Sequence, residues 1–364
     1  MTPRYFVGLM SGTSLDGVDA VLGEDTGGKW RFPHAAHLPY PPDIRQDALA
    51  LHDTGTDELR RAALLANRLA TLYAQAVHAL LAKASLQPTA IKAIGCHGQT
   101  IRHAPRAGYT TQLNSPALLA ELTGMTVVAD FRSRDIAAGG EGAPLVPAFH
   151  DALFRRTDRH RVIVNLGGIA NLTDLAPDRP TTGFDCGPAN ILLDAWIQRH
   201  RQQAFDLDGR WARQGRSLPA LLERLMRHEF LRLPPPKSCG RKEFDLAWLE
   251  QHLDGSERAE DVQATLLAFT VNTVADAVSH HCGGASELFV CGGGTRNVAL
   301  LEELGLRLNG IRIATTDELG LPAEHVEAAA FAWLACRCLD GEPGNLPTVT
   351  GARGPRILGA IYPA

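Results

Sequence analysis

Two patterns of hydrophobic and polar residues alternate along this chain. Short apolar runs at 5–10, 90–96, 126–129, 161–166 and 288–291 predict buried strands. Longer stretches at 57–84, 115–124, 259–281 and 324–339 predict helices, and over 57–84 the apolar residues recur every three or four positions. The alternation restarts after about residue 135, which predicts two similar α/β halves. We expect one domain over 1–135 plus 345–364, with a closing strand at 357–361, and a second domain over 136–344.

A tight polar turn ends the first apolar run. Residues 11–14 read Ser-Gly-Thr-Ser and the apolar pattern soon resumes, which leaves room for a hairpin turn but not for a helix. Gly12 and Gly17 lack a Cβ atom, so backbone amides can close on an anion, and the hydroxyl groups suit phosphate oxygens. Asp16 and Asp19 suit Mg²⁺ held through water, because this cation prefers carboxylate oxygen. The spacing is not that of a P-loop, and an ordinary Gly/Ser-rich hairpin is the alternative.

Two more glycine turns follow predicted strands in the second half, at Gly167–Gly168 and at Gly292–Gly294. Three such turns favour a nucleotide site over three unrelated turns. Two of them would face each other across the halves and hold the phosphates, and the third would lie under the adenosine. The predicted nucleotide-binding residues are Gly12, Thr13, Ser14, Leu15, Asp16, Gly17, Val18, Asp19, Asn165, Gly167, Gly168, Gly292, Gly293, Gly294 and Asn297.

Polar residues outside these turns are candidates for catalysis and substrate binding. Asp185 suits a general base, since phosphoryl transfer needs a group that takes the nucleophile's proton, but an N-cap aspartate is the alternative. His97 follows a predicted strand, where side chains face the ligand crevice of an α/β sheet. Arg132 and Arg134 suit a fork for a carboxylate, with two solvated arginines as the alternative. Glu327 opens an apolar helix, where a helix-terminus charge is the alternative.

Composition narrows the class of protein. The 364 residues suggest roughly two domains, and 45% hydrophobic with 21% charged residues is ordinary for a globular protein. A net charge of −4 gives no reason to expect nucleic acid or an anionic membrane as partner. No signal peptide or apolar run long enough to span a bilayer is found, so we expect a cytoplasmic location. Seven scattered cysteines predict neither a disulfide framework nor a zinc site.

Several blocks, in order along the chain, resemble the anhydro-N-acetylmuramic acid kinases. These blocks are 8–19 (GLMSGTSLDGVD), 97–103 (HGQTIRH), 141–147 (EGAPLVP), 165–171 (NLGGIAN) and 292–294 (GGG). The glycine turns alone would indicate only the wider superfamily of actin, heat-shock chaperones and sugar kinases. The full set is specific to the family and spans nearly the whole chain. Cys186 and Ala189 depart from the family pattern, which has Thr and Gly at these places.

The resemblance implies two actin-like, ribonuclease H-like α/β domains with an ATP cleft between them. It also implies an enzyme that uses ATP, Mg²⁺ and water to convert 1,6-anhydro-N-acetylmuramic acid into N-acetylmuramic acid 6-phosphate during cell-wall (murein) recycling. The base is the aspartate of a Phe-Asp-x-Gly-Pro block, here Asp185, which would activate the water. A homodimer is compatible with the resemblance. The residues predicted to bind the amino sugar are His97, Gln99, Thr100, Arg132, Arg134 and Glu327.

Two alternatives stay open at this point. A kinase of the same superfamily could act on an ordinary sugar hydroxyl, with Asp185 deprotonating that hydroxyl in place of water. A non-catalytic ATP-binding module of the actin or heat-shock-chaperone kind could instead grip a protein partner. Substrate-dependent release of ADP separates this module from both kinases.

Overall fold

The computed structural model describes residues 2–12, 14–239 and 243–364, and the chain divides into two compact units. The first unit comprises Met1–Phe149 with His325–Ala364, and the second comprises His150–Glu324. The chain passes from the first unit into the second within α5 (Val146–Phe154). No helix in the described part of the chain combines the length and apolar character that a membrane crossing needs.

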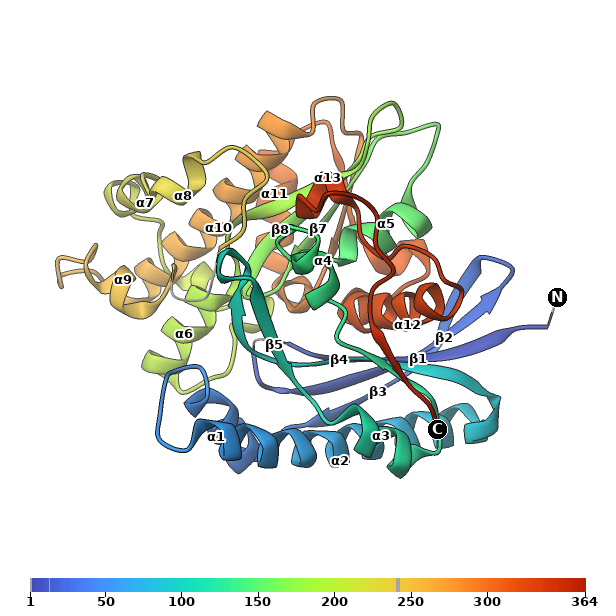
Figure 1. The fold of residues 1–364 in the computed structure, drawn as a ribbon. Helices are drawn as coiled ribbons and strands as arrows, with labels where there is room; N and C mark the ends of the chain where they lie inside the picture. The colour runs from blue at the N-terminus through green and yellow to red at the C-terminus, as the bar shows by residue number, and fades with distance from the viewer. Residues whose placement is uncertain (1, 13, 240–242) are drawn as a thin grey trace. The chain divides into compact units, whose positions relative to one another are not determined.

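The first unit is built on a seven-stranded mixed sheet (Figure 1). The strand order is β12-β6-β4-β1-β2-β3, and β5 pairs with β4. β1, β2 and β3 form an antiparallel meander, whereas β4 and β6 extend the sheet in parallel with β1. The strands are β1 (Arg4–Ser11), β2 (Gly17–Thr26), β3 (Lys29–Pro39), β4 (Ile91–Ala104), β5 (Tyr109–Leu113), β6 (Val127–Ala129) and β12 (Ala360–Tyr362).

Helices cover both faces of this sheet (Figure 1). α2 (Glu58–Ala84) packs on β2 and β3 through its apolar stripe, while α12 (Val326–Leu339) lies against β1 and β4. Glycine permits this second contact: a Cβ atom on Gly8 would lie 1.8 Å from the Ala328 carbonyl oxygen, and one on Gly95 would lie 2.0 Å from that of Phe331. The other helices of the unit are α1 (Pro42–Ala50), α3 (Pro116–Thr123), α4 (Ser133–Ala137) and α13 (Pro347–Thr350).

The second unit repeats this strand arrangement. Its sheet has the order β11-β10-β7-β8-β9, with β7, β8 and β9 as an antiparallel meander and β10 and β11 parallel to β7. The strands are β7 (Arg161–Leu166), β8 (Ile169–Leu175), β9 (Thr182–Pro188), β10 (Glu287–Cys291) and β11 (Arg312–Thr315). The helices are α6 (Asn190–Arg201), α7 (Pro219–Met226), α8 (Glu229–Arg232), α9 (Leu246–Glu250), α10 (Ala259–His281) and α11 (Val298–Arg307).

The predicted fold class is confirmed. Each unit has three antiparallel strands followed by two parallel strands, and a long helix precedes the first parallel strand, α2 before β4 and α10 before β10. This is the ribonuclease H-like arrangement, and its duplication is actin-like. Some details were not predicted, including β5 and the short helices α7 and α8.

The bounds of the compact units differ from the sequence-based domains. Residues 136–149 and 325–344, which the sequence analysis assigns to the second half, fold with the first unit. α12 does so because it packs on β1 and β4. Buried Asp135 adds a second tie, since its carboxylate accepts hydrogen bonds from Asn345 Nδ2 (2.6 Å), Thr350 Oγ1 (2.8 Å) and the Gly142 amide (2.8 Å).

Candidate active site

A buried polar network supports the turn between β1 and β2. Gln99 is fully buried, and its Nε2 donates to the carbonyl oxygen of Gly12 at 3.1 Å. The Tyr40 hydroxyl donates to Gln99 Oε1 at 3.2 Å, and the Ser11 hydroxyl lies 2.7 Å from that of Tyr73. Gln99, predicted to bind the sugar, therefore holds the glycine turn in place.

The turn combines exposed residues, Ser14 and Asp16, with buried ones. Thr13 lies outside the described residues. The side chains of Leu15 and Val18 are buried in the core, so only their backbone atoms can contact a nucleotide. Gly12 is open: among the described residues, only Ser14 Oγ, at 3.7 Å, would come within 4 Å of a Cβ atom placed there. This open backbone fits the close approach of a phosphate.

Two carboxylates follow this turn. Asp16 Oδ1 accepts a hydrogen bond from Ser14 Oγ at 2.7 Å, and Asp19 Oδ1 lies 2.9 Å from His37 Nδ1 on β3. Burial raises the pKa of Asp19, its hydrogen bond with His37 lowers it, and the charge of Asp16 raises it. No group of three or more His, Cys, Asp or Glu side chains that could hold a metal occurs in the described part of the chain. A Mg²⁺ ion at Asp16 and Asp19 would therefore keep most of its coordination as water, which this ion favours.

His97, Arg132 and Glu327 form a second polar group in the first unit. Arg132 donates to His97 Nε2 from Nε (3.1 Å) and Nη2 (2.9 Å), and its Nη1 donates to the Gly142 carbonyl oxygen at 2.8 Å. Burial and the charge of Arg132 hold the pKa of His97 well below its usual range, so the ring is a neutral acceptor. Burial lowers the pKa of Arg132 to about 10, although Glu327 opposes this change. Burial raises the pKa of Glu327, and Arg132 lowers it.

The structure does not form the predicted arginine fork. Arg132 is engaged by His97, whereas Arg134 is exposed within α4. Residues two positions apart on a helix do not face the same side. Thr100, also predicted on the sugar side, accepts a hydrogen bond from Gln112 Nε2 on β5 at 3.2 Å. The roles of Arg134 and Thr100 toward a sugar stay predictions.

The other two glycine turns lie together in the second unit. A Cβ atom on Gly292 would lie 2.3 Å from Asn165 Oδ1, and one on Gly294 would lie 2.5 Å from the Leu166 Cβ atom. The loop after β10 thus packs backbone-close on the end of β7, and only glycine permits this approach. The sequence analysis placed these two turns in one site, and this part of the geometry agrees.

Two of the polar side chains beside these turns bond to the backbone, and a third has an oxygen that accepts no hydrogen bond from a described residue. Asn190, the first residue of α6, donates from Nδ2 to the carbonyl oxygens of Leu166 and Gly167, at 2.8 Å each. Asn297 caps α11 by accepting from the Leu300 amide at 3.1 Å. By contrast, Asn165 Oδ1 is buried and accepts no hydrogen bond from a described residue. A bound ligand could donate to this oxygen, which fits the predicted nucleotide role.

Asp185 lies within β9, where only 9% of the residue is exposed. The N-cap alternative is wrong, because α6 begins at Asn190 and the residue before its first turn is Ala189. Asp185 Oδ2 accepts hydrogen bonds from Ser238 Oγ (3.0 Å) and from the Cys239 amide (2.9 Å). Among the described residues none donates to Oδ1. Within the described part of the chain, one carboxylate oxygen is therefore held while the other has no donor.

Burial and neighbouring groups shift the pKa of this carboxylate. Burial raises the pKa of Asp185 to about 6, although the two hydrogen bonds and the charge of Lys237 oppose this rise. A carboxylate with this pKa is largely ionised at neutral pH, yet it is a stronger base than an exposed aspartate. Sequence reasoning missed Lys237, Ser238 and Cys239, because the proline-rich segment before them indicates only a rigid loop.

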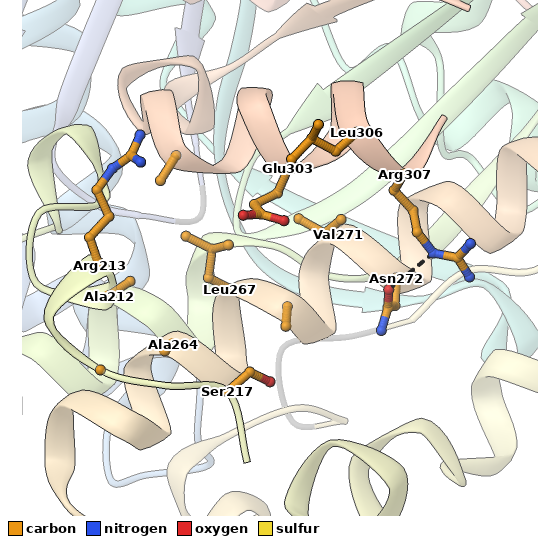
Figure 2. A pocket seen from close by; sticks show the side chains of 13 residues that line it. Ala212, Arg213, Ser217, Ala264, Leu267, Val271, Asn272, Glu303, Leu306 and Arg307 are labelled. Atoms are coloured by element: carbon orange, nitrogen blue, oxygen red, sulfur yellow. Dashed lines mark hydrogen bonds between the residues drawn. The ribbon is translucent and has the colours of Figure 1, made fainter. Parts of the chain in front are cut away.

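A cavity of about 420 Å³ lies elsewhere in the second unit. It lies between α10 and α11, where Leu267 and Val271 contribute to its apolar wall (Figure 2). Figure 2 shows Arg213 at one end and Arg307 at the other, where Arg307 Nε donates to Asn272 Oδ1 at 3.4 Å. None of the predicted site residues lines this cavity.

Comparisons with known proteins identify the family of this chain. Two ribonuclease H-like sheets with glycine turns beyond their strands define an actin-like α/β protein. The family model described as anhydro-N-acetylmuramic acid kinase matches residues 4–364, so the chain belongs to this family. A protein of that name from Nitrosospira multiformis is 55% identical and covers 100% of both chains. Another of that name, from Bordetella petrii, is 56% identical over 99% of this chain and 97% of its own.

One solved structure is also similar. Component A of (R)-2-hydroxyglutaryl-CoA dehydratase from Acidaminococcus fermentans has a TM-score of 0.49 and 13% sequence identity to this chain. The similarity covers 90% of this chain and 96% of that one.

Proposed function

We propose that this protein is an ATP-dependent kinase that hydrolytically opens 1,6-anhydro-N-acetylmuramic acid and phosphorylates O6, giving N-acetylmuramic acid 6-phosphate for murein recycling. Family membership along residues 4–364 supports the reaction class. The observation that carries the mechanism is Asp185, a buried carboxylate with one oxygen held by two donors and the other without a donor among residues 2–12, 14–239 and 243–364. A cytoplasmic location and a homodimer stay predictions.

Asp185 acts as general base on a water molecule. The anhydro bridge leaves no free hydroxyl at C6, so water must attack C1 while the C1–O6 bond breaks. The free Oδ1 of Asp185 takes a proton from this water as the new C1–O bond forms. ATP supplies the γ-phosphoryl group to O6 and leaves as ADP. With a pKa of about 6, Asp185 is ready to accept the proton at neutral pH.

The glycine turns supply the nucleotide contacts. The open backbone at Gly12 and Gly293, where a Cβ atom would meet little or nothing, supports close contact with phosphate or adenosine. Asp16 and Asp19 would hold Mg²⁺ through water, and the ion would neutralise charge on the phosphate oxygens. The unpartnered Oδ1 of Asn165 supports a ligand contact beside the turn of the second unit.

Arg132 and its neighbours provide the sugar contacts. Muramic acid carries a lactyl carboxylate, and a guanidinium group suits this anion. Arg132 is partly buried and keeps its orientation through His97 and Gly142, which leaves its charge only partly balanced by Glu327. His97 is neutral and therefore positions Arg132 without competing for the carboxylate.

The experiment that tests this proposal follows the oxygen of water. Purified protein, ATP and Mg²⁺ are incubated with the anhydro sugar in ¹⁸O-labelled water, and the product is analysed by mass spectrometry and NMR. We expect the label at C1 and none in the phosphate, with the α-anomer appearing first because attack opposite O6 inverts C1.

Two outcomes would contradict the proposal, and each points to a different alternative. Faster ADP release with free N-acetylmuramic acid than with the anhydro sugar would favour a kinase of a free sugar, which transfers the phosphoryl group to a hydroxyl of the sugar and takes up no solvent oxygen. ADP release that neither the anhydro sugar nor free N-acetylmuramic acid stimulates would favour a non-catalytic ATP-binding module.

A further inference from the structure

The segment Lys237–Cys239 contacts Asp185 at three points. The Asp185 amide donates to the Lys237 carbonyl oxygen at 3.0 Å, which places the segment alongside β9. Ser238 Oγ and the Cys239 amide then both donate to Oδ2 of the Asp185 side chain. These two donors hold Oδ2 in place, because both bind the same oxygen.

Lys237 anchors this segment to the body of the second unit. Its Nζ donates to the carbonyl oxygens of Phe230 and Leu231, at 3.1 Å each. Both carbonyls belong to α8 (Glu229–Arg232), where helix-end carbonyls lack partners within the helix. The ammonium group also lies 4.7 Å from the centre of the Phe230 ring and 5.9 Å from that of Phe184, which precedes Asp185 on β9. The charge is thus held beside the base without forming an ion pair with it.

We propose that Lys237, Ser238 and Cys239 form a clamp that positions Asp185, holding Oδ2 so that Oδ1 alone faces the nucleophile. The proposal rests on the proposed role of Asp185 as general base and assigns positioning residues to it. Neutral donors on Oδ2 orient the carboxylate and lower its pKa, but burial outweighs them and keeps the pKa at about 6. A direct ion pair with Lys237 would orient it equally well but would weaken the base.

The charges around the clamp fit these roles, in which neutral donors orient Asp185 and Lys237 forms no ion pair with it. Cys186 on β9 and Cys239 in the clamp are the thiols beside Asp185, and burial raises the pKa of both, so both stay protonated near neutral pH. Burial and the charge of Lys237 lower the pKa of His281, whose ring packs on Phe184. The fixed positive charge of Lys237 lowers the pKa of Asp185 from a distance.

The test removes each clamp interaction and restores it with a conservative residue. Ser238→Ala should lower kcat roughly tenfold and leave the KM values for sugar and ATP within about threefold, because hydrogen bonds to charged groups contribute at this level. The acid limb of its kcat–pH profile should move up by about one pH unit, since a donor to the charged form is lost. Ser238→Thr should restore both. Lys237→Met should shift the same limb in the same direction, and Lys237→Arg should reverse most of the change.

Matched control variants break similar bonds at exposed positions. Ser256 Oγ donates to Asp254 Oδ1 at 2.6 Å, and Lys83 Nζ donates to the Ala35 carbonyl oxygen at 3.0 Å. Ser256→Ala and Lys83→Met should keep the wild-type kcat and pH profile. Ser238 is exposed, so Ser238→Ala should fold, and circular dichroism will verify this.

The outcomes separate the clamp from the function on which it rests. If Asp185→Asn is inactive but Ser238→Ala and Lys237→Met keep the wild-type kcat and acid limb, the clamp is refuted while the base stands. If Ser238→Ala changes KM alone, Ser238 binds substrate and does not position the base. If Asp185→Asn is itself active, the base assignment fails, and the proposed mechanism fails with it.

Discussion

The two sheets of this protein share the order of five strands, yet they surround a carboxylate in different ways. In the first unit Asp19 lies on the middle strand of the meander, β2, and pairs with His37 on β3. In the second unit Asp185 lies on the outer strand, β9, and its side-chain donors among the described residues are uncharged, the Ser238 hydroxyl and the Cys239 amide. Burial raises the pKa of both carboxylates, but what opposes the rise is chiefly an imidazole at Asp19 and a hydroxyl with an amide at Asp185.

This difference suggests a division of tasks. A carboxylate beside another acid, as Asp19 is beside Asp16, suits a cation that keeps its water, whereas a single carboxylate among neutral donors suits proton transfer. A duplicated fold can thus place unlike chemistry on matching meanders, because the side chains that surround each carboxylate come from different loops.

The largest effect is expected from Asp185→Asn. The substitution keeps the shape and removes the base, so sugar phosphorylation should fall by two orders of magnitude or more while ATP binding persists. ADP release and nucleotide titration measure the two properties. Asp208→Asn is the matched control, because Asp208 is an exposed acid of the same unit, paired with Arg210. Near-normal turnover in folded Asp185→Asn would mean that Asp185 is not the general base, and that the two carboxylates do not differ in this way.

The centres of the two sheets also differ, and Gly95→Ala tests this difference. In the first unit Gly8 and Gly95 pair across β1 and β4 and let the α12 backbone approach, whereas Val164 and Val290 form the matching pair in the second. A methyl group on Gly95 would lie 2.0 Å from a backbone oxygen, so we expect a loss of about 3 kcal/mol in the free energy of unfolding. Urea unfolding measures it. Gly293→Ala, at an open position, should change stability by less than about 1 kcal/mol, and equal losses would contradict this packing argument.

Much of the fold could be predicted because its signals are local. Apolar runs that end in glycine turns indicate hairpins, and the apolar spacing of α2 indicates a helix, so the duplicated α/β class follows. The assignment of α12 could not be predicted. Gly8 and Gly95 weaken a strand pattern, and only the structure shows that they make room for a helix far along the chain.

Some residues of the candidate site could be predicted from the sequence, and others could not. The glycine turns and Asp185 could be chosen from sequence, because their residue types suit phosphate and proton transfer. The supports of these residues could not. Ser238 is 53 positions from Asp185, and Tyr73 has the spacing of an ordinary core residue on α2 although its hydroxyl contacts Ser11. Asp185 also suggested a helix cap, because sequence does not show that β9 continues to Pro188.

A third prediction sharpens the comparison of the two turns. Gln99 supports the turn of the first unit from a neighbouring strand, and Asn190 supports that of the second from the start of a helix. Gln99→Leu leaves the Gly12 carbonyl oxygen and the Tyr40 hydroxyl without this partner, so the KM for ATP should rise about tenfold. Asn190→Leu should have a smaller effect, because the backbone amide of residue 190 still donates to Gly167 at 3.0 Å. Steady-state kinetics with ATP and sugar varied separately measure both. A rise in the KM for the sugar alone would indicate that Gln99 binds the sugar and does not support the nucleotide turn.

The stability of the protein should also depend on pH through Asp185. Asp185 has a pKa of about 6 in the folded protein, above the value of about 3.9 for an unfolded chain. The folded state therefore binds more protons between these values, and the contribution of this group to stability is present below pH 4 and lost as the pH rises through 6. Asp185→Asn removes this loss. The difference in the free energy of unfolding, variant minus wild type, should therefore rise by on the order of 2 kcal/mol between pH 4 and pH 8. Urea unfolding of both proteins at the two pH values measures the difference. If this difference instead falls between pH 4 and pH 8, the clamp stabilises the ionised carboxylate. Asp185 would then not differ from Asp19 in the way proposed.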